Sequence, residues 1–349
     1  MKIEKIIGPK ANGVAYTNKD FKNASPVKWC PGCGDHAMLA ALHKAMAEVG
    51  VAPYETVVVS GIGCSSRLPY YMDSYGMHTI HGRGAAVATG VKVANPNLNV
   101  WLMSGDGDSL AIGGNHFIHM IRRNVGINMV LFNNRIYGLT KGQYSPTSVR
   151  GFVSKSSPFG TVEDPFNPAE LVFGARGTFF ARTLDVDMAL SAKCMVAAHN
   201  HPGASVVEAL VNCVIFNNGT HKGYSDREIR AERTILLEHG KPMIFGAKRD
   251  KGLILDGLEI KVVTIGEGGI TEGDLLVHDA HTPQPILHQL LANMHEINSE
   301  LPLALGVIRD VKDLVYEEEL TNQIIAIQEK RPNLTVQQFL DGLSRWEVK

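Results

Sequence analysis

Residues 99–107 read NVWLMSGDG, an apolar run that leads directly into Gly105-Asp106-Gly107. The same order, a short apolar run followed by glycine or polar residues, recurs at 56–60, 128–132 and 205–211. Apolar residues at helical spacing occupy the segments 35–48, 84–93, 110–123, 168–173 and 186–199. Strands that alternate with helices predict an α/β fold, in which a parallel sheet is flanked by helices.

The ends of the predicted strands carry residues suited to chemistry. Four of them follow a strand within a few positions: Cys64, Asp106, Asn134 and Cys213. In parallel sheets of this class, ligands bind beyond the carboxyl ends of the strands. We therefore expect these four residues to meet at one edge of the sheet and to form a single site.

The composition is that of a globular protein. The 349 residues are 44% hydrophobic and carry a formal net charge of -1, a balance that favours neither nucleic acid nor a membrane surface as a partner. The sequence shows no secretion signal near Met1 and no apolar run long enough to span a bilayer, so we expect a cytoplasmic protein.

The pattern changes beyond about Ala231. There we expect a strand at 261–265 and helices at 284–294 and 335–346. We divide the chain into an α/β domain that binds the cofactors, residues 1–230, and a C-terminal extension, residues 231–349. Within the first part, Gly113 and Gly114 weaken the predicted helix 110–123, which suggests that another backbone or subunit packs closely there.

Gly105-Asp106-Gly107 and Asn133-Asn134 have the character of a magnesium diphosphate site. Mg²⁺ prefers oxygen ligands, which Asp106 and Asn134 supply from neighbouring strand ends. The glycines let the backbone approach phosphate groups, and the free N–H groups of the helix that follows attract their charge. A pair of ordinary turns is the alternative, because these residue types all favour turns. Their joint occurrence after two apolar strands favours the diphosphate interpretation.

The five cysteines suggest a second cofactor. Cys30 and Cys33 share one Cys-x-x-Cys turn, whereas Cys64 and Cys213 follow separate strands. Four thiolates are the usual ligands of a [4Fe-4S] cluster. A zinc site is an alternative, and a redox dithiol is disfavoured because the motif follows a polar loop rather than a strand. Cys194 competes for the fourth place, but it lies within a predicted helix among apolar residues, where cysteine is usually a core residue.

These motifs together resemble the β subunits of 2-oxoacid:ferredoxin oxidoreductases, in particular those specific for 2-oxoglutarate. Gly105-Asp106-Gly107 with Asn133-Asn134 is similar to the thiamin diphosphate motif of that family. The resemblance covers roughly residues 25–225 and includes GIGCSS at 61–66, HGR at 81–83 and YGLTKGQ at 137–143. It implies a thiamin diphosphate-binding fold.

The resemblance also implies ligands. Mg²⁺ would be held by Asp106, Asn134 and the carbonyl of Ile136, and the [4Fe-4S] cluster by Cys30, Cys33, Cys64 and Cys213. Thiamin diphosphate would be lined by Ile62, Gly63, Cys64, Ser65, His81, Gly107, Asp108, Gly138 and Leu139. Two of these have simpler alternatives: an ordinary polar loop residue for His81 and a helix N-cap for Asp108.

The substrate is expected to meet two cations, Arg67 and Lys141, whose alternative is a role as surface charges. Two cations suit a dicarboxylate such as 2-oxoglutarate. By the resemblance, the enzyme would convert a 2-oxoacid and coenzyme A to acyl-CoA and CO2, with electrons passing through the cluster to ferredoxin.

No catalytic acid or base is assigned to this chain. The resemblance implies that the activating glutamate comes from an α subunit, or a fused γ/α chain, so the isolated chain is expected to be inactive. Alternatives are a pyruvate-specific or branched-chain member, a non-oxidative thiamin diphosphate decarboxylase, and a non-catalytic iron-sulfur electron carrier.

Overall fold

A computed structural model describes residues 11–330 and 335–342, together with Trp346 and Val348. Its strands are β1 (Thr56–Ser60), β2 (Tyr75–His78), β3 (Asn99–Gly105), β4 (Ile127–Asn133), β5 (Phe179–Leu184), β6 (Ser205–Leu210), β7 (Thr234–Leu237), β8 (Ile244–Phe245), β9 (Lys251–Asp256), β10 (Glu259–Thr264) and β11 (Leu303–Asp310). Its α-helices are α1 (Asp35–Val49), α2 (Gly84–Ala94), α3 (Gly114–Arg122), α4 (Pro168–Gly174), α5 (Met188–Asn200), α6 (Lys222–Ser225), α7 (Arg230–Arg233), α8 (Ile286–Ile297), α9 (Tyr316–Lys330) and α10 (Val336–Asp341).

The main sheet has eight strands in the order β2-β1-β3-β4-β6-β5-β11-β7. The strands from β2 to β5 in this order run parallel to one another, whereas β11 pairs antiparallel with β5 and parallel with β7. A smaller antiparallel sheet has the order β10-β9-β8. The predicted α/β architecture with a mainly parallel sheet is therefore confirmed.

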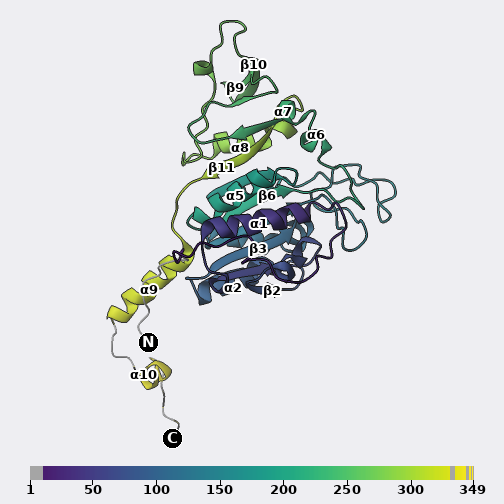
Figure 1. The fold of residues 1–349 in the computed structure, drawn as a ribbon. Helices are drawn as coiled ribbons and strands as arrows, with labels where there is room; N and C mark the ends of the chain where they lie inside the picture. Colours follow the sequence, from purple (N-terminus) through teal and green to yellow (C-terminus); the bar gives the residue numbers. More distant parts are fainter. Residues whose placement is uncertain (1–10, 331–334, 343–345, 347, 349) are drawn as a thin grey trace.

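Helices cover both faces of the inner parallel strands, which accounts for the continuous burial of β1, β4, β5 and β6, whereas the edge strand β2 is exposed. Successive side chains of β3 alternate between two cores. Val100 and Leu102 pack in a core with residues of α2 and α3. Trp101 and Met103 pack in a second core with residues of α1 and α5, which lie side by side in Figure 1.

The later part of the chain contributes to the same sheet. β7 and β11 extend its edge, and α8 packs on β11. The small sheet of β8 to β10 lies beyond them (Figure 1), with β10 at the predicted strand 261–265 and α8 at the predicted helix 284–294. The division at residue 230 stays a prediction about folding units.

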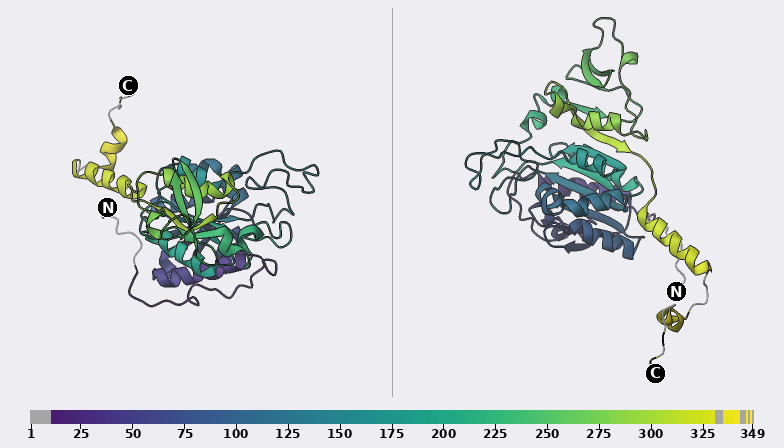
Figure 2. Two further views of the ribbon diagram at one scale, coloured as in Figure 1. Left: turned by 90° about the horizontal axis from the view of Figure 1, so that it is seen from above. Right: turned by 180° about the vertical axis from the view of Figure 1, so that it is seen from behind.

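Helix α9 extends away from the body, and α10 follows it (Figures 1 and 2). Glu317 anchors the first turn of α9. Its buried carboxylate accepts hydrogen bonds from Gly126 N at 3.1 Å and lies 3.9 Å from Lys92 Nζ. The predicted helix 335–346 overlaps α10, and its positions 343–345 lie outside the described residues. Among the described helices, none combines the length and apolar character needed to cross a membrane.

The predicted helix 110–123 is divided in the structure. A π-helical turn, Asp108–Ile112, precedes α3, and Gly113 lies between them. A Cβ at Gly113 would be 2.3 Å from Asp108 O and 3.2 Å from Gly82 Cα, so another backbone does pack closely there. Gly114 has no described atom that close, and its role is not explained by packing.

Candidate cofactor and metal site

A cavity of about 160 Å³ lies at the carboxyl ends of β1, β3 and β4. Its wall is formed by Ile62, Gly63, Cys64, Ser65, His81, Gly105, Asp106, Gly107, Asp108, Asn134, Ile136, Tyr137, Gly138, Leu139 and Thr140. Every residue predicted to bind Mg²⁺ or to line thiamin diphosphate is in this set. Arg67 and Lys141 are outside it. The structure thus brings the predicted oxygen ligands and cofactor residues to one cavity, and their individual roles stay predictions.

Asp106 is one of two buried acids that line the cavity, and the residue is 2% exposed. The Ser145 hydroxyl donates to Asp106 Oδ2 at 2.6 Å, and the Thr147 hydroxyl also donates to Oδ2. Burial raises the pKa of Asp106, while these two hydroxyls oppose the shift. A carboxylate held in this way is suited to a cation, because a nearby positive charge favours the ionised form that burial disfavours.

Asn134 and Ile136 approach the cavity through one local turn. Ile136 N–H donates to Asn134 Oδ1 at 3.1 Å, a side-chain to backbone bond that is typical of Asx turns. Arg135 between them adopts a left-handed conformation with φ of 55°. The turn therefore presents an amide side chain and a backbone carbonyl, both oxygen donors, from adjacent positions.

Asp108 joins three loops around the cavity. Its Oδ1 accepts from Ile62 N at 3.0 Å and Gly82 N at 2.7 Å and lies 2.6 Å from His81 Nδ1, while the Ser104 hydroxyl donates to Oδ2. A Cβ at Gly61 would lie 1.7 Å from Asp108 Oδ2, so that position requires glycine. Gly107 occupies the N-cap position of the turn Asp108–Ile112, so the simple capping alternative does not describe Asp108.

His81 has its ring orientation set by this acid. Because Nδ1–H donates to Asp108, the other ring nitrogen, Nε2, is the one left for a ligand. The side chain is 38% exposed on the cavity wall. His81 is thus a constrained residue of the cavity wall, and its role toward a cofactor stays a prediction.

Four wall or supporting residues were not predicted from the sequence: Tyr137 and Thr140 on the wall, and Ser145 and Thr147 behind it. The Tyr137 hydroxyl donates to Gly107 O at 3.0 Å, and a Cβ at Gly107 would lie 2.2 Å from the tyrosine ring. Ser145 and Thr147 reach Asp106 from a loop far along the chain. Hydroxyl residues are common in loops, so the sequence carries no local signal that marks these two.

Four of the five cysteines gather beside the cavity. Cys33 N–H donates to Cys30 O at 3.1 Å within the Cys-x-x-Cys turn, and Gly34 N–H donates to Asn212 O at 3.1 Å, which joins that turn to the loop of Cys213. A Cβ at Gly138 would be 3.6 Å from Cys64 Sγ and from Cys213 Sγ. Cys194 is instead buried in a core with residues of β5 and β6, as its apolar surroundings suggested.

The clustered thiols act on one another electrostatically. The pKa of Cys64 is raised to about 12, first by burial and then by Asp35, Cys213 and Cys30. Burial likewise raises the pKa of Cys33, with further contributions from Asp35, Cys213 and Cys64. A bound metal would favour the thiolate forms that burial disfavours. Within the described residues, no three or more His, Cys, Asp or Glu side chains converge tightly enough to hold a single metal ion.

The two predicted substrate cations lie outside the cavity wall. Arg67 is half-buried in a 3-10 helix, Ser65–Tyr71, and its charge partly opposes the rise in the pKa of Cys64, which places it near the sulfur group. Lys141 is exposed and follows the wall residue Thr140, with φ of 77°. Their role as carboxylate partners stays a prediction.

A buried ion pair behind the turn of Asn134 was also not predicted from the sequence. Arg182 in β5 and Glu208 in β6 are direct partners across the two strands, and Arg182 Nε donates to Glu208 Oε2 at 2.7 Å. Their side chains are 3% and 2% exposed. The sequence contains one indication of this pair, a glutamate in the middle of the apolar run SVVEALV, residues 205–211.

Comparison with known proteins agrees with this site. Residues 61–209 match the C-terminal TPP binding domain of thiamine pyrophosphate enzymes. The chain is 42% identical over 332 residues to the 2-oxoglutarate oxidoreductase subunit KorB of Mycobacterium tuberculosis, across 95% of this chain and 88% of that protein. It is 46% identical over 188 residues to the 2-oxoglutarate synthase subunit KorB of Archaeoglobus fulgidus, across 54% of this chain and 70% of that protein.

A solved structure extends the likeness to the whole fold. The 2-oxoglutarate:ferredoxin oxidoreductase from Magnetococcus marinus, with 2-oxoglutarate, coenzyme A and succinyl-CoA bound, has a TM-score of 0.74 and 31% identity, and the match covers 97% of this chain and 99% of that chain. The thiamin diphosphate-binding fold expected from the motifs is confirmed by the domain match. This chain belongs to the family of β subunits of 2-oxoacid:ferredoxin oxidoreductases.

Proposed function

We propose that this chain is the cofactor-binding subunit of an enzyme that oxidatively decarboxylates 2-oxoglutarate to an acyl-CoA and CO2 and passes the electrons to ferredoxin. One observation carries the proposal: oxygen donors and a group of sulfurs meet at the same edge of the sheet. Gly138 lies on the wall of the cavity that Asp106 and Asn134 also line, and the position of its absent Cβ is 3.6 Å from Cys64 Sγ and Cys213 Sγ.

The donor set of the cavity fits Mg²⁺ with a diphosphate. Asp106 would supply a carboxylate, Asn134 an amide oxygen and Ile136 a backbone carbonyl, a hard set that leaves positions for phosphate oxygens. Thiamin diphosphate, when bound, supplies the electron sink that lets a 2-oxoacid lose CO2. The chain's own part is to hold the diphosphate end, with Ser145 and Thr147 fixing Asp106 and with Asp108 fixing the loops of Gly61 and His81.

The sulfur group fits a [4Fe-4S] cluster, for which four thiolates are the usual ligands. Cys30, Cys33, Cys64 and Cys213 would be those ligands. Cys64 lines the cofactor cavity, whereas Cys30 is exposed, so the set extends from the cavity to the surface. This arrangement suits an electron carrier that serves a cofactor on one side and a soluble partner such as ferredoxin on the other.

The proposed substrate is 2-oxoglutarate, with Arg67 and Lys141 as partners of its carboxylates. Relatives from Mycobacterium tuberculosis and Archaeoglobus fulgidus carry names that specify 2-oxoglutarate, and the Magnetococcus marinus structure contains 2-oxoglutarate and coenzyme A. A guanidinium and an ammonium group together match two negative charges better than the single charge of pyruvate.

A partner subunit is part of the proposal. An α chain, or a fused γ/α chain, would supply the other half of the thiamin site and the activating glutamate. The chain purified alone should then turn over no 2-oxoacid. Turnover of 2-oxoglutarate by the isolated chain would contradict this point.

The test is anaerobic co-purification with the α partner, followed by assays of 2-oxoglutarate, pyruvate and a branched-chain 2-oxoacid with coenzyme A and a low-potential dye. We expect coenzyme A-dependent dye reduction that is fastest with 2-oxoglutarate, together with iron and sulfide in the protein. Decarboxylation without iron or dye reduction would indicate a non-oxidative thiamin enzyme. Iron without any binding of thiamin diphosphate would indicate an electron carrier.

A further inference from the structure

We propose that Glu208, paired with Arg182, is a positioning residue for the Mg²⁺ ligands, and that it acts through Asn133 and Thr147. The inference rests on the proposed function in one respect, the binding of Mg²⁺ and diphosphate at Asp106 and Asn134. Neither Glu208 nor Arg182 lines the cofactor cavity. They reach it through a continuous row of hydrogen bonds.

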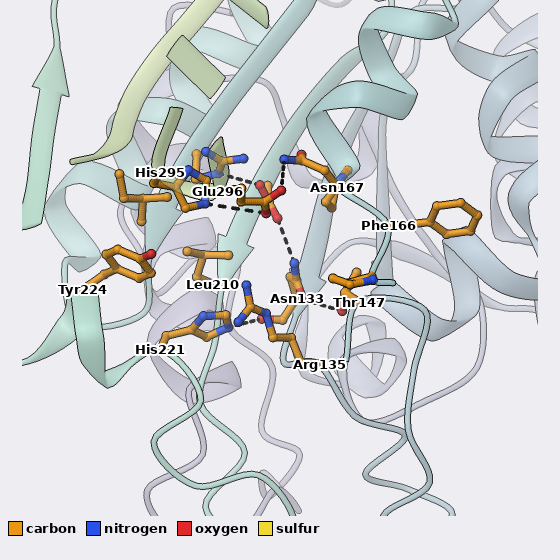
Figure 3. Close-up of a pocket in the computed structure, with 15 residues that line it drawn as sticks. Asn133, Arg135, Thr147, Phe166, Asn167, Leu210, His221, Tyr224, His295 and Glu296 are labelled. Carbon is orange, nitrogen blue, oxygen red and sulfur yellow. Dashed lines mark hydrogen bonds and ion pairs between the residues drawn. The ribbon is translucent and has the colours of Figure 1, made fainter. Parts of the chain in front are cut away.

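Asn133 is the central member of that row and immediately precedes the predicted ligand Asn134. Its Nδ2 donates to Glu208 Oε1 at 2.8 Å, and its Oδ1 lies 2.9 Å from the Thr147 hydroxyl, which is also bonded to Asp106. The backbone carbonyl of Asn133 accepts from His221 Nε2 at 2.9 Å. Figure 3 shows Asn133 between Thr147 and His221, with dashed lines to both.

The carboxylate of Glu208 fixes which way the Asn133 amide points. An ionised carboxylate only accepts hydrogen bonds, so the NH2 group of Asn133 must face it and the amide oxygen must face Thr147. A reversed amide would place two oxygens against each other at Glu208. The Thr147 hydroxyl has a single proton and two acceptors within reach, Asn133 Oδ1 at 2.9 Å and Asp106 Oδ2. It donates to one of them at a time, so the orientation that Glu208 imposes on Asn133 sets how this proton is shared with Asp106.

Arg182 makes this buried carboxylate possible. It lies opposite Glu208 in the strand register, donates to Oε2 at 2.7 Å through Nε and donates to Ala292 O at 2.8 Å through Nη1. Ala292 lies in α8, so the row ends on the later part of the chain. Stability alone does not account for such a pair, because apolar residues of similar volume stabilise a core as well or better. A fixed acceptor for Asn133 is the function that apolar residues cannot replace.

The decisive variant replaces both charges together, Arg182→Met with Glu208→Leu, so that no unpaired charge is left buried. We measure Mg²⁺-dependent binding of thiamin diphosphate by calorimetry on the complex with its α partner, and thermal unfolding of the same samples. We expect Mg²⁺ affinity to fall about 10- to 100-fold, the usual effect of losing a residue that orients metal ligands, while the unfolding temperature stays near that of the wild type. Saturating Mg²⁺ should restore kcat.

The matched control is the other buried ion pair, Lys92 with Glu317, near the amino end of β4. Lys92→Met with Glu317→Gln should leave Mg²⁺ affinity unchanged, even if it lowers the unfolding temperature. If the Arg182→Met, Glu208→Leu variant binds Mg²⁺ as tightly as the wild type does, the proposal is overturned. An equal loss of affinity in the control would also overturn it, because general loosening of the sheet would then be the cause.

A second variant keeps the proposal falsifiable if the double replacement fails to fold. Glu208→Gln preserves volume but can present an NH2 group to Asn133 or to Arg182, so one of these donors loses its acceptor. We expect a weaker loss of Mg²⁺ affinity, about 10-fold, and an unchanged affinity would again overturn the proposal. Failure of the wild-type complex to bind Mg²⁺ and thiamin diphosphate at all would instead contradict the proposed function.

Discussion

The two ends of the parallel strands bury polar side chains in different ways. At the amino ends, a row of hydrogen bonds crosses the sheet from Asn99 to Thr56 at 3.3 Å, from Asn128 to Asn99 at 3.3 Å, and from Ser205 to Asn128 at 3.1 Å. These side chains are hydrogen-bonded to one another within the sheet. At the carboxyl ends, Asp106 and its neighbours line a cavity instead, with glycines and further oxygen donors around it.

Cavity size alone would not have identified the proposed cofactor cavity. The cavity at the amino ends, lined by Lys92, Asn99, Asn128 and His199 among others, is about 340 Å³, compared with about 160 Å³ at the carboxyl ends. What distinguishes the smaller cavity is its chemistry: hard oxygen donors, glycines that allow close approach, and sulfurs next to Gly138. The comparison predicts that changes at the carboxyl ends alter cofactor binding and that changes at the amino ends alter stability.

The largest expected effect follows from removing a clustered thiol. Cys64→Ser or Cys213→Ser should abolish dye reduction, because a four-cysteine site that loses one thiolate no longer holds its cluster. Cys194→Ala is the matched control and should keep its iron and activity, since Cys194 is buried in α5. Iron and sulfide content and dye reduction provide the measurement. Full activity in both serine variants would show that the sulfur group is not a cluster site.

The second-largest expected effect is a loss of Mg²⁺ affinity. Asp106→Asn removes the charge from the oxygen set, and we expect Mg²⁺ affinity to fall about 1,000-fold, which corresponds to roughly 4 kcal/mol. Calorimetry with Mg²⁺ and thiamin diphosphate measures it. Glu317→Gln, which neutralises a buried acid near the amino end of β4, should leave that affinity unchanged. If both variants bind Mg²⁺ normally, the cation lies elsewhere.

A prediction at the amino ends concerns acid stability. Burial lowers the pKa of His199 to about 4, with a further contribution from Lys92. The unfolded chain takes up this proton below pH 6.5 but the folded chain does not, so stability present above pH 6.5 is lost as the pH falls toward 4. The loss amounts to about 3 kcal/mol. Urea unfolding at several pH values should show a shallower decline in His199→Gln than in the wild type.

Measuring cofactor binding distinguishes this stability effect from the effects expected at the cofactor cavity. The His199→Gln variant should bind Mg²⁺ and thiamin diphosphate normally at pH 7, because the residue lies at the end of α5 near Asn99. If the free energy of unfolding declines equally with pH in the variant and the wild type, His199 is not the group that titrates. Weakened Mg²⁺ binding in the variant would contradict the separation between the two ends.

The sequence was sufficient to bring the predicted residues to one edge of the sheet because its signals are local. Each apolar strand is followed directly by its chemical residue, and Cys64, Asp106, Asn134 and Cys213 do follow β1, β3, β4 and β6. Parallel pairing then fixes which edge they share. The strand β5, FFARTL, was not predicted, because Arg182 interrupts its apolar pattern. That arginine is buried against Glu208, a partner that lies 26 positions away in the chain.

The parts that sequence reasoning missed depend on tertiary contacts. The exposed edge strand β2 has no apolar alternation to reveal it. Helix α9 buries Glu317 and Thr321 rather than an apolar stripe, so its periodicity gives little indication of a helix. Asp108 was interpreted as a cofactor residue or an N-cap, whereas its bonds to Ile62, Gly82 and His81 depend on loops that only the fold brings together.

The smallest expected effect tests how finely the carboxyl ends are arranged. Thr147→Val keeps the shape of the side chain but removes one of the two hydroxyls that hold Asp106 Oδ2, and Ser145 remains at 2.6 Å. We therefore expect Mg²⁺ affinity to fall about 10-fold, or roughly 1.4 kcal/mol, well short of the Asp106→Asn effect.

Thr183→Val is the matched control, because Thr183 in β5 is a similarly buried threonine that lies away from the cavity, and its hydroxyl lies 2.8 Å from that of Ser191. It should lower stability by about 1 kcal/mol and leave Mg²⁺ affinity unchanged. If Thr147→Val behaved like this control, Ser145 alone would suffice to hold Asp106. If it matched Asp106→Asn, Thr147 would itself be bound to the cation, and the metal site would include the loop that we describe as its support.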